Sequence, residues 1–131
     1  MNGETNLTTL LRSMEPHLWE QPFIFCSLDP AAYERMEITP IGMFREREGI
    51  TLIIDQQQAD QAGIPYADLW ACITLNIHSS LTAVGFIAAI SSKLATAGLS
   101  VNPVSAYYHD HLFVLWGERE RVMGLLREFN Q

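Results

Sequence analysis

The string His109-Asp110-His111 holds side chains that are well suited to chemistry. Two histidines two positions apart would share one face of a β-strand, and His78 could approach them from the end of a neighbouring strand. Zinc accepts imidazole and carboxylate ligands, so these four residues could form a metal site. Against this, the string lies at a predicted turn, where aspartate is common, and no cysteine or further histidine stands at metal-ligand spacing. We favour a structural role or contact with a polar ligand, and we expect neither a metal nor a cofactor.

A second candidate site is the turn between a predicted strand and a predicted helix at residues 78–85. Backbone N–H groups at a helix N-terminus attract carboxylates, so the α-carboxylate of an amino acid would suit this turn. Ser79 and Ser80 add hydroxyl donors, and Gly85 lets a ligand or a neighbouring chain approach closely. The alternative is structural: one serine caps the helix, and Gly85 relieves crowding against the sheet. The expected ligand-binding residues are His78, Ser79, Ser80, Leu81, Val84 and Gly85, with polar contacts from Asn102, His109 and His111.

A run of alternating charge, Arg45-Glu46-Arg47-Glu48, marks the tip of a predicted hairpin. Arg45 could hold a carboxylate there, and Glu48 could hold an ammonium group. Such a run is more commonly a solvated turn whose ion pairs contribute little, and we favour that interpretation. Arg45 and Glu48 are therefore the fallback positions for ligand binding.

The motifs that organise common catalytic sites are missing from the sequence. It has no G-x-S-x-G, no glycine-rich phosphate loop and no H-E-x-x-H. Ser79 follows His78, but neighbours along a strand point to opposite faces, so the two cannot act as nucleophile and base. We expect a protein that is not an enzyme.

The elements that must position these residues are clearest in the second half of the chain. Alternation predicts strands there, and helical spacing predicts helices. The first is a strand at 71–78. A helix follows from Ser79 or Ser80 to Gly98, with Leu81 and Val84 on its apolar side. Strands at 101–108 and 112–116, joined by a turn at 109–111, and a helix at 118–129 complete the chain. This is the order of a ferredoxin-like fold without its last strand.

The first half reads as a related α+β unit. Its predicted elements are a helix that begins at Leu7 and ends before Pro16, a strand at 23–27, a loop at 31–40, a hairpin of 41–45 and 50–55 turned by Gly49, and a helix at 56–62 between Asp55 and Gly63. The missing edge strand of one unit could be supplied by the other. Because no low-complexity segment separates the halves, we expect them to share one core.

Several segments resemble ACT-type amino-acid-binding regulatory domains, and most closely a small bacterial family of stand-alone tandem ACT-like proteins. These segments are Leu75–Phe86, Leu94–Ser100, Asn102–Ser105, His109–Val114 and, in the first half, Phe44–Thr51. The resemblance implies an α+β fold of two ferredoxin-like, ACT-type βαββαβ units in tandem, at 1–66 and 67–131, with antiparallel sheets and helices on one face. It also implies regulation rather than catalysis, since ACT domains bind amino acids or similar small metabolites where domains pair.

Composition excludes several partners for this chain of 131 residues. Eight Lys and Arg against 15 Asp and Glu give a net charge of −7 and no basic cluster for nucleic acid or an anionic membrane. Cys26 and Cys72 each lie in an apolar run and are expected to be buried, reduced thiols. No signal peptide is visible at the N-terminus, and the longest largely apolar stretch, Leu81–Ile90, is too short to span a bilayer. We expect a cytoplasmic protein.

The favoured function is non-enzymatic regulation through a bound small molecule, with an amino acid as the expected ligand. The alternatives are a metal-binding protein or small metal-dependent enzyme that uses the histidines, and an interaction module without a small ligand. In each case we expect a symmetric homodimer, because open sheet edges are otherwise prone to unwanted pairing.

Overall fold

The computed structural model describes residues 6–77 and 84–131, and the chain divides into two compact units. Residues 20–70 form the first, which we name the inserted unit. The segments on either side, up to residue 19 and from residue 71 onward, together form the second, which we name the composite unit. The expected boundary between residues 66 and 67 thus differs from the structural boundaries, because the N-terminal segment packs with the C-terminal half.

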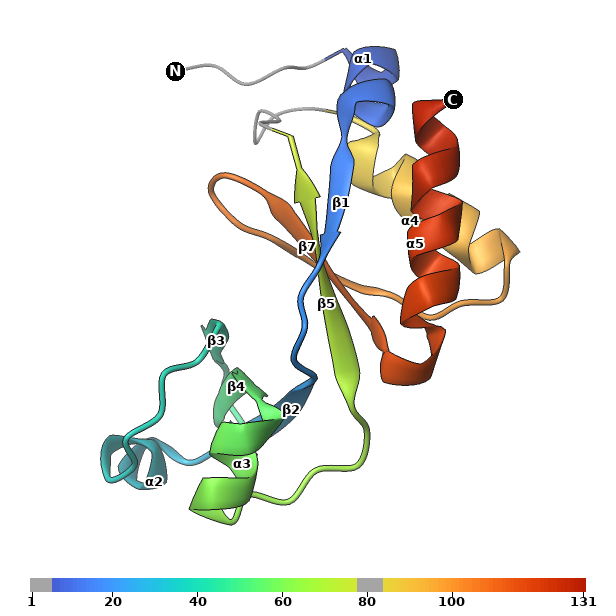
Figure 1. Ribbon diagram of the computed structural model, residues 1–131. Helices are drawn as coiled ribbons and strands as arrows, with labels where there is room; N and C mark the ends of the chain where they lie inside the picture. The colour runs from blue at the N-terminus through green and yellow to red at the C-terminus, as the bar shows by residue number, and fades with distance from the viewer. Residues whose placement is uncertain (1–5, 78–83) are drawn as a thin grey trace. The chain divides into compact units, whose positions relative to one another are not determined.

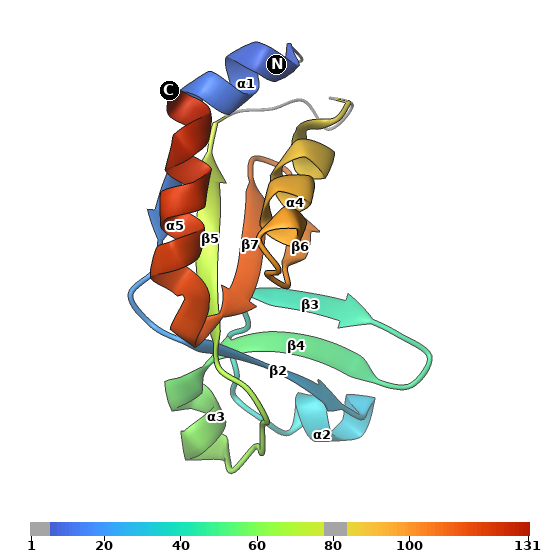
Figure 2. The same ribbon diagram turned by 90° about the vertical axis from the view of Figure 1, so that its right-hand side faces the viewer.

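The composite unit is a sheet with two helices on one face (Figures 1 and 2). Its elements are α1 (Leu7–Ser13), β1 (Glu15–Leu18), β5 (Trp70–Asn76), α4 (Phe86–Thr96), β6 (Asn102–Ser105), β7 (Asp110–Leu115), α5 (Arg119–Arg127) and the 3-10 turns η1 (Trp116–Glu118) and η2 (Glu128–Asn130). The strand order is β1-β5-β7-β6. Figure 2 shows α4 and α5 covering the same face of β5 and β7. This is the ferredoxin-like α+β arrangement that the sequence predicts.

The last strand of that arrangement is β1, which comes from the other end of the chain. It pairs antiparallel with β5 from Glu15 opposite Asn76 to Leu18 opposite Ile73. The prediction that one half supplies the missing edge strand of the other is therefore confirmed. The sequence does not predict this strand, since Pro16 indicates only the end of a helix. Proline is tolerated here because β1 is an edge strand, whose outer side donates no ladder hydrogen bonds.

The core of the composite unit lies between its helices and its sheet. It takes Ala71, Ile73 and Leu75 from β5, and Leu10 and Met14 from the N-terminal segment. Its remaining buried members are Phe86, Ile90, Leu94, Leu99, Leu112, Val114, Val122, Met123 and Leu126. Both Leu10 and Met14 are completely buried, so the N-terminal segment is an integral part of this core.

The inserted unit is built from β2 (Phe23–Leu28), α2 (Pro30–Glu34), β3 (Gly42–Arg45), β4 (Ile50–Asp55) and α3 (Gln56–Ala62), with strand order β3-β4-β2. The hairpin and the helix after it are confirmed. Asp55 caps α3 by accepting from the Gln58 N–H, and Gly63 ends it in the left-handed conformation. The prediction of a loop at 31–40 is wrong at its start, where α2 lies. Asp29 caps α2 by accepting from the Ala32 N–H at 2.9 Å.

The expectation of one shared core is wrong for the described residues. The inserted unit has its own apolar cluster, made of Ile24, Ile50, Leu52, Ile54, Ala59 and Ile64, and no member of it belongs to the cluster of the composite unit. Each unit thus buries its own apolar face. Among the described helices, none combines the length and the apolar character needed to cross a membrane.

Candidate functional site

The first candidate site lies where α4 begins. The helix was predicted to start after Ser79 or Ser80, but it starts at Phe86, with Gly85 at the N-cap and no side-chain cap. A serine cap for this helix is therefore wrong. His78, Ser79, Ser80 and Leu81 lie outside the described residues. Val84 precedes the helix with 83% of its surface exposed, so it does not belong to the apolar side of α4 as predicted.

Gly85 is required by its backbone conformation rather than by crowding against the sheet. Its φ is +89°, in the left-handed region that favours glycine. A Cβ at this position would lie 3.5 Å from Leu7 Cδ2, which is ordinary van der Waals contact. The neighbour is thus α1, and not a strand. The first N–H groups of an α-helix have no partners within the helix, so the start of α4 can receive an anionic group.

The second group of candidate residues lies on the hairpin of β6 and β7. The backbone N–H of Ala106 donates to the His109 carbonyl at 3.0 Å, which places Tyr107 and Tyr108 in the loop. The predicted turn at 109–111 is therefore wrong for its last two residues, since β7 already begins at Asp110. The register explains this shift: Ser105 pairs with Asp110 and Val104 pairs with His111. Asn102, at the start of β6, is exposed.

His109 and His111 lie on the same face, with ring centroids 6.4 Å apart. His111 Nδ1 is 2.9 Å from the hydroxyl oxygen of Thr74 on β5. The Trp19 indole N–H donates to the same oxygen at 2.8 Å. Burial lowers the pKa of His111, the nearby His109 lowers it further, and Asp110 raises it in part. The histidine side chain is therefore held by a polar contact in a partly desolvated position.

Among the residues that the structure describes, no three His, Cys, Asp or Glu side chains lie close enough together to hold a metal ion. Asp110 and His111 are neighbours on one strand, so their side chains leave it on opposite faces. The two thiols are suited to packing rather than to ligation. Burial raises the pKa of Cys72 to about 12, although a hydrogen bond with Thr74 acts in the opposite direction. Burial also raises the pKa of Cys26.

The charged hairpin tip belongs to the inserted unit, and its four residues, Arg45 to Glu48, are all exposed. The Thr51 hydroxyl donates to the Glu46 carboxylate. Gly49 passes close to β2, since a Cβ there would lie 2.7 Å from Ser27 Oγ. The tip is thus a solvated turn, anchored to the sheet at its two ends.

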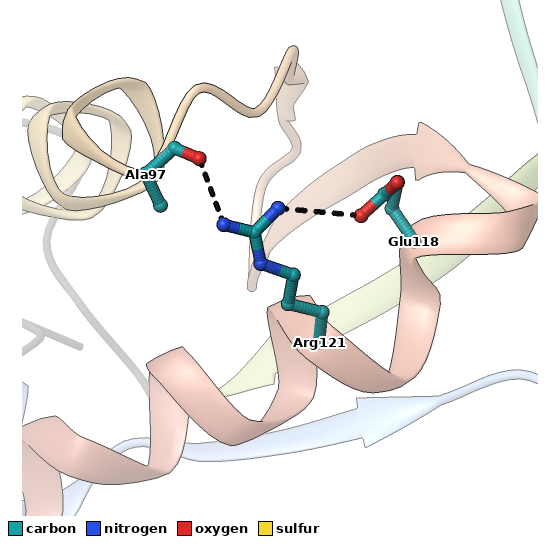
Figure 3. A network of polar contacts seen from close by, with 3 residues as sticks. All are labelled: Ala97, Glu118 and Arg121. Carbon is teal, nitrogen blue, oxygen red and sulfur yellow. Dashed lines mark hydrogen bonds and ion pairs between the residues drawn. The ribbon is translucent and has the colours of Figure 1, made fainter.

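Two features that hold the composite unit together were not predicted. Arg121 on α5 donates to the Ala97 carbonyl at the end of α4 at 3.0 Å, and its other terminal nitrogen lies 3.7 Å from Glu118 (Figure 3). The Asn130 side chain donates to the carbonyls of Leu11, Arg12 and Met14 at the end of α1. Each joins segments far apart in the sequence, so neither leaves a local sequence signal.

Comparison with known proteins gives consistent matches. Two ACT domain families match, one over residues 2–71 and the other over residues 68–128. A crystal structure of a protein of unknown function from Vibrio cholerae, described as a "Possible Transport Protein", is 41% identical, with a TM-score of 0.86 over 95% of this chain and 96% of that one. A comparison with curated protein sequences gives no match.

More distant solved structures share the fold. A structure of aspartokinase alpha and beta subunits has 11% identity and a TM-score of 0.64, over 87% of this chain and 95% of that one. The aspartate kinase of Clostridium acetobutylicum, described as an allosteric enzyme, has 8% identity and a TM-score of 0.64, over 88% of this chain and 34% of that one. Both matches concern the arrangement of helices and strands.

Proposed function

Since this chain belongs to the ACT domain family, we propose that it is a non-enzymatic regulatory protein whose ligand is an amino acid. The tandem match carries this proposal, because the two ACT regions together span residues 2–128. ACT domains are small-molecule-binding regulatory modules, which supports the coarser role for the chain as a whole. The identity of the ligand as an amino acid is the further step that we add.

The proposed binding site is the start of α4 together with the chain segment that precedes it. Its residues are His78, Ser79, Ser80, Leu81, Val84 and Gly85. The helix N-terminus favours a carboxylate, which every free amino acid carries. The glycine adds a second advantage, since a residue without a side chain leaves its backbone open to a ligand.

Polar contacts to the ligand are proposed from Asn102, His109 and His111. The Nδ1 atom of His111 is engaged by Thr74, so its Nε2 atom is the one that can meet a ligand. The hairpin pair Arg45 and Glu48 is the fallback site. Their opposite charges match the carboxylate and the ammonium group of a zwitterion, and both side chains are exposed.

The proposed assembly is a cytoplasmic homodimer without nucleic-acid or membrane partners. The strand β6 is an end strand of its sheet, and all four of its residues are exposed. The two cysteines are free thiols in the structure, which is compatible with a reducing compartment. Exposed aromatic residues add apolar surface, with Phe44 on β3 71% exposed.

A thermal-shift screen against the twenty amino acids tests the ligand directly. A ligand present at about one hundred times its Kd stabilises the folded state by about 2.7 kcal/mol, which is readily detected. We expect one amino acid, or one chemical group of them, to raise the unfolding temperature. Stabilisation by a divalent metal instead, with metal retained by the purified protein, would favour the histidine-based alternative. No response to any amino acid would favour an interaction module.

A further inference from the structure

A row of polar side chains crosses the sheet of the composite unit on the face opposite α4 and α5. Ala71, Ile73 and Leu75 of β5 point into the core beneath the helices, so Thr74 points to the other face. His17 of β1 lies directly across from Thr74 in the register, and His111 of β7 is hydrogen-bonded to Thr74 on its other side. The row therefore joins the exchanged strand β1 to the two central strands.

The hydrogen bonds in this row depend on the protonation of His111. An indole N–H can only donate, so the Thr74 oxygen accepts from Trp19 and its own proton is free to be donated. The Nδ1 atom of a neutral His111 can accept that proton. A protonated His111 carries a hydrogen on Nδ1, and the threonine proton must then turn away. The other partner of Thr74 is the sulfur of Cys72, which is a weak acceptor.

Burial and the neighbouring His109 oppose the protonation of His111, whereas Asp110 favours it. His109, just before β7, lies beside it, and Asp110 on β7 points to the opposite face. From β1, His17 occupies the same row and Glu15 occupies the next row, opposite Asn76. The neighbouring strand β6 carries no titratable side chain, and β5 contributes only the Cys72 thiol. Among these groups, His109 lowers the pKa of His111 and Asp110 raises it in part.

We propose that Trp19, Thr74 and His111 form an acid-sensitive latch on the exchanged strand. With His111 neutral, the latch is closed and holds the end of β1 against β5. Protonated His111 becomes a second donor to the Thr74 oxygen, which already accepts from Trp19, and the Thr74 proton loses its acceptor. Because an oxygen that donates to His111 is a better acceptor than one shared by two donors, the hold on Trp19 weakens and the end of β1 opens more often. The lowered pKa of His111 agrees with this direction. The latch uses the Nδ1 atom of His111, whereas Nε2 is the atom proposed to meet a ligand.

Hydrogen exchange of the Trp19 backbone amide tests the latch, since this amide donates to the Cys72 carbonyl at 3.0 Å. Exchange is measured at about pH 7.5 and about pH 5 and corrected for the intrinsic rate. We expect the end of β1 to open more often at the lower pH. The increase should be about tenfold for each pH unit by which the pKa of His111 in the closed state lies below its pKa in the open state. Protection that does not change with pH in the unmodified protein overturns the proposal.

Two variants assign the effect to His111. The amide oxygen of Asn in His111→Asn can accept the Thr74 proton and does not titrate, so the acid response should disappear while protection at neutral pH remains. His17→Phe is the matched control on the same row, because it keeps an aromatic ring against the Trp19 ring, whose centroid lies 6.4 Å from that of His17, and does not titrate; it should keep the acid response. An acid response retained in His111→Asn, or lost in His17→Phe, overturns the proposal.

A measurement on the unmodified protein covers the case in which a variant fails to fold. The Trp19 indole N–H resonance should shift along the titration of His111 in nuclear magnetic resonance spectra. A titration of His111 that leaves this resonance in place contradicts the latch.

Discussion

Leu10→Ala tests whether the N-terminal segment belongs to the core of the composite unit. Leu10 lies on α1, far in sequence from the strands and helices that it packs against, and its side chain is completely buried. Truncation to alanine removes the apolar contact and leaves a cavity. In well-packed cores such a change costs about 2–5 kcal/mol. We expect about 3 kcal/mol here, which lies within that range.

The expected thermal shift follows from the size of the unit. For domains of roughly 60–100 residues, each kcal/mol lowers the melting temperature by about 4–8 °C, so the composite unit should melt roughly 12–24 °C lower. Thr8→Ala is the matched control, because Thr8 lies on the same helix and is exposed. Surface substitutions of that kind usually change stability by less than about 0.5 kcal/mol.

Calorimetry combined with hydrogen exchange identifies the unit that is affected. The Ile90 amide in α4 reports on the composite core, and the Ala59 amide in α3 reports on the inserted core. We expect Leu10→Ala to accelerate exchange at Ile90 much more than at Ala59. Equal effects of Leu10→Ala and Thr8→Ala on melting, or a larger effect at Ala59, would refute the assignment of α1 to the composite unit.

Three further predictions concern the C-terminal tail, the pH dependence and the assembly. Asn130→Ala removes the amide that donates to three carbonyls of the α1 segment, so urea denaturation should show a loss of about 1 kcal/mol, while Gln131→Ala should show almost none. The pKa of His111 is lowered from its ordinary value of 6.5, so the unfolded chain takes up the proton first as the pH falls. The contribution of His111 to the free energy of unfolding should therefore be constant above about pH 6.5 and decrease as the pH drops from there towards the lowered pKa. This decrease should be absent in His111→Asn. Sedimentation at micromolar concentration should show a dimer, and a single species of 14.8 kDa would contradict it.

Local signals in the sequence were sufficient for elements whose boundaries are chemically marked. Asp55 and Gly63 predict both ends of α3, and the structure uses both as caps. The order of elements in the second half was sufficient for the ferredoxin-like fold. The same order also indicated that a strand was missing, which led to the correct expectation of an exchanged strand.

Features that depend on distant contacts could not be predicted in this way. Pro16 ends a helix and also lies in β1, and only pairing with β5 decides that the segment after the helix is a strand. The contact between Thr74 and His111 depends on which strands are neighbours and on their register. A shift of one residue would have moved either side chain to the other face.

The start of α4 was misplaced because two good serine caps precede it in the sequence. The helix instead begins after Gly85, whose positive φ sets the entry of the chain. Helix α2 was missed for the opposite reason. The pair Asp29-Pro30 is a strong start signal, but the segment after it shows no apolar period. A short helix that buries little surface has no such period to show.

The measurement that tests the central claim most directly is isothermal titration of the amino acid found in the thermal-shift screen. The account predicts saturable binding to the unmodified protein, weaker binding to Ser80→Ala and no binding to Gly85→Leu. Gly85→Ala is the matched control, because it carries the same backbone strain at φ +89° without the bulk, and its Cβ would fit beside Leu7. Circular dichroism must show that each variant is folded. Unchanged affinity in a folded Gly85→Leu protein would contradict the proposed site, and the absence of binding by any amino acid to the unmodified protein would contradict the proposed function.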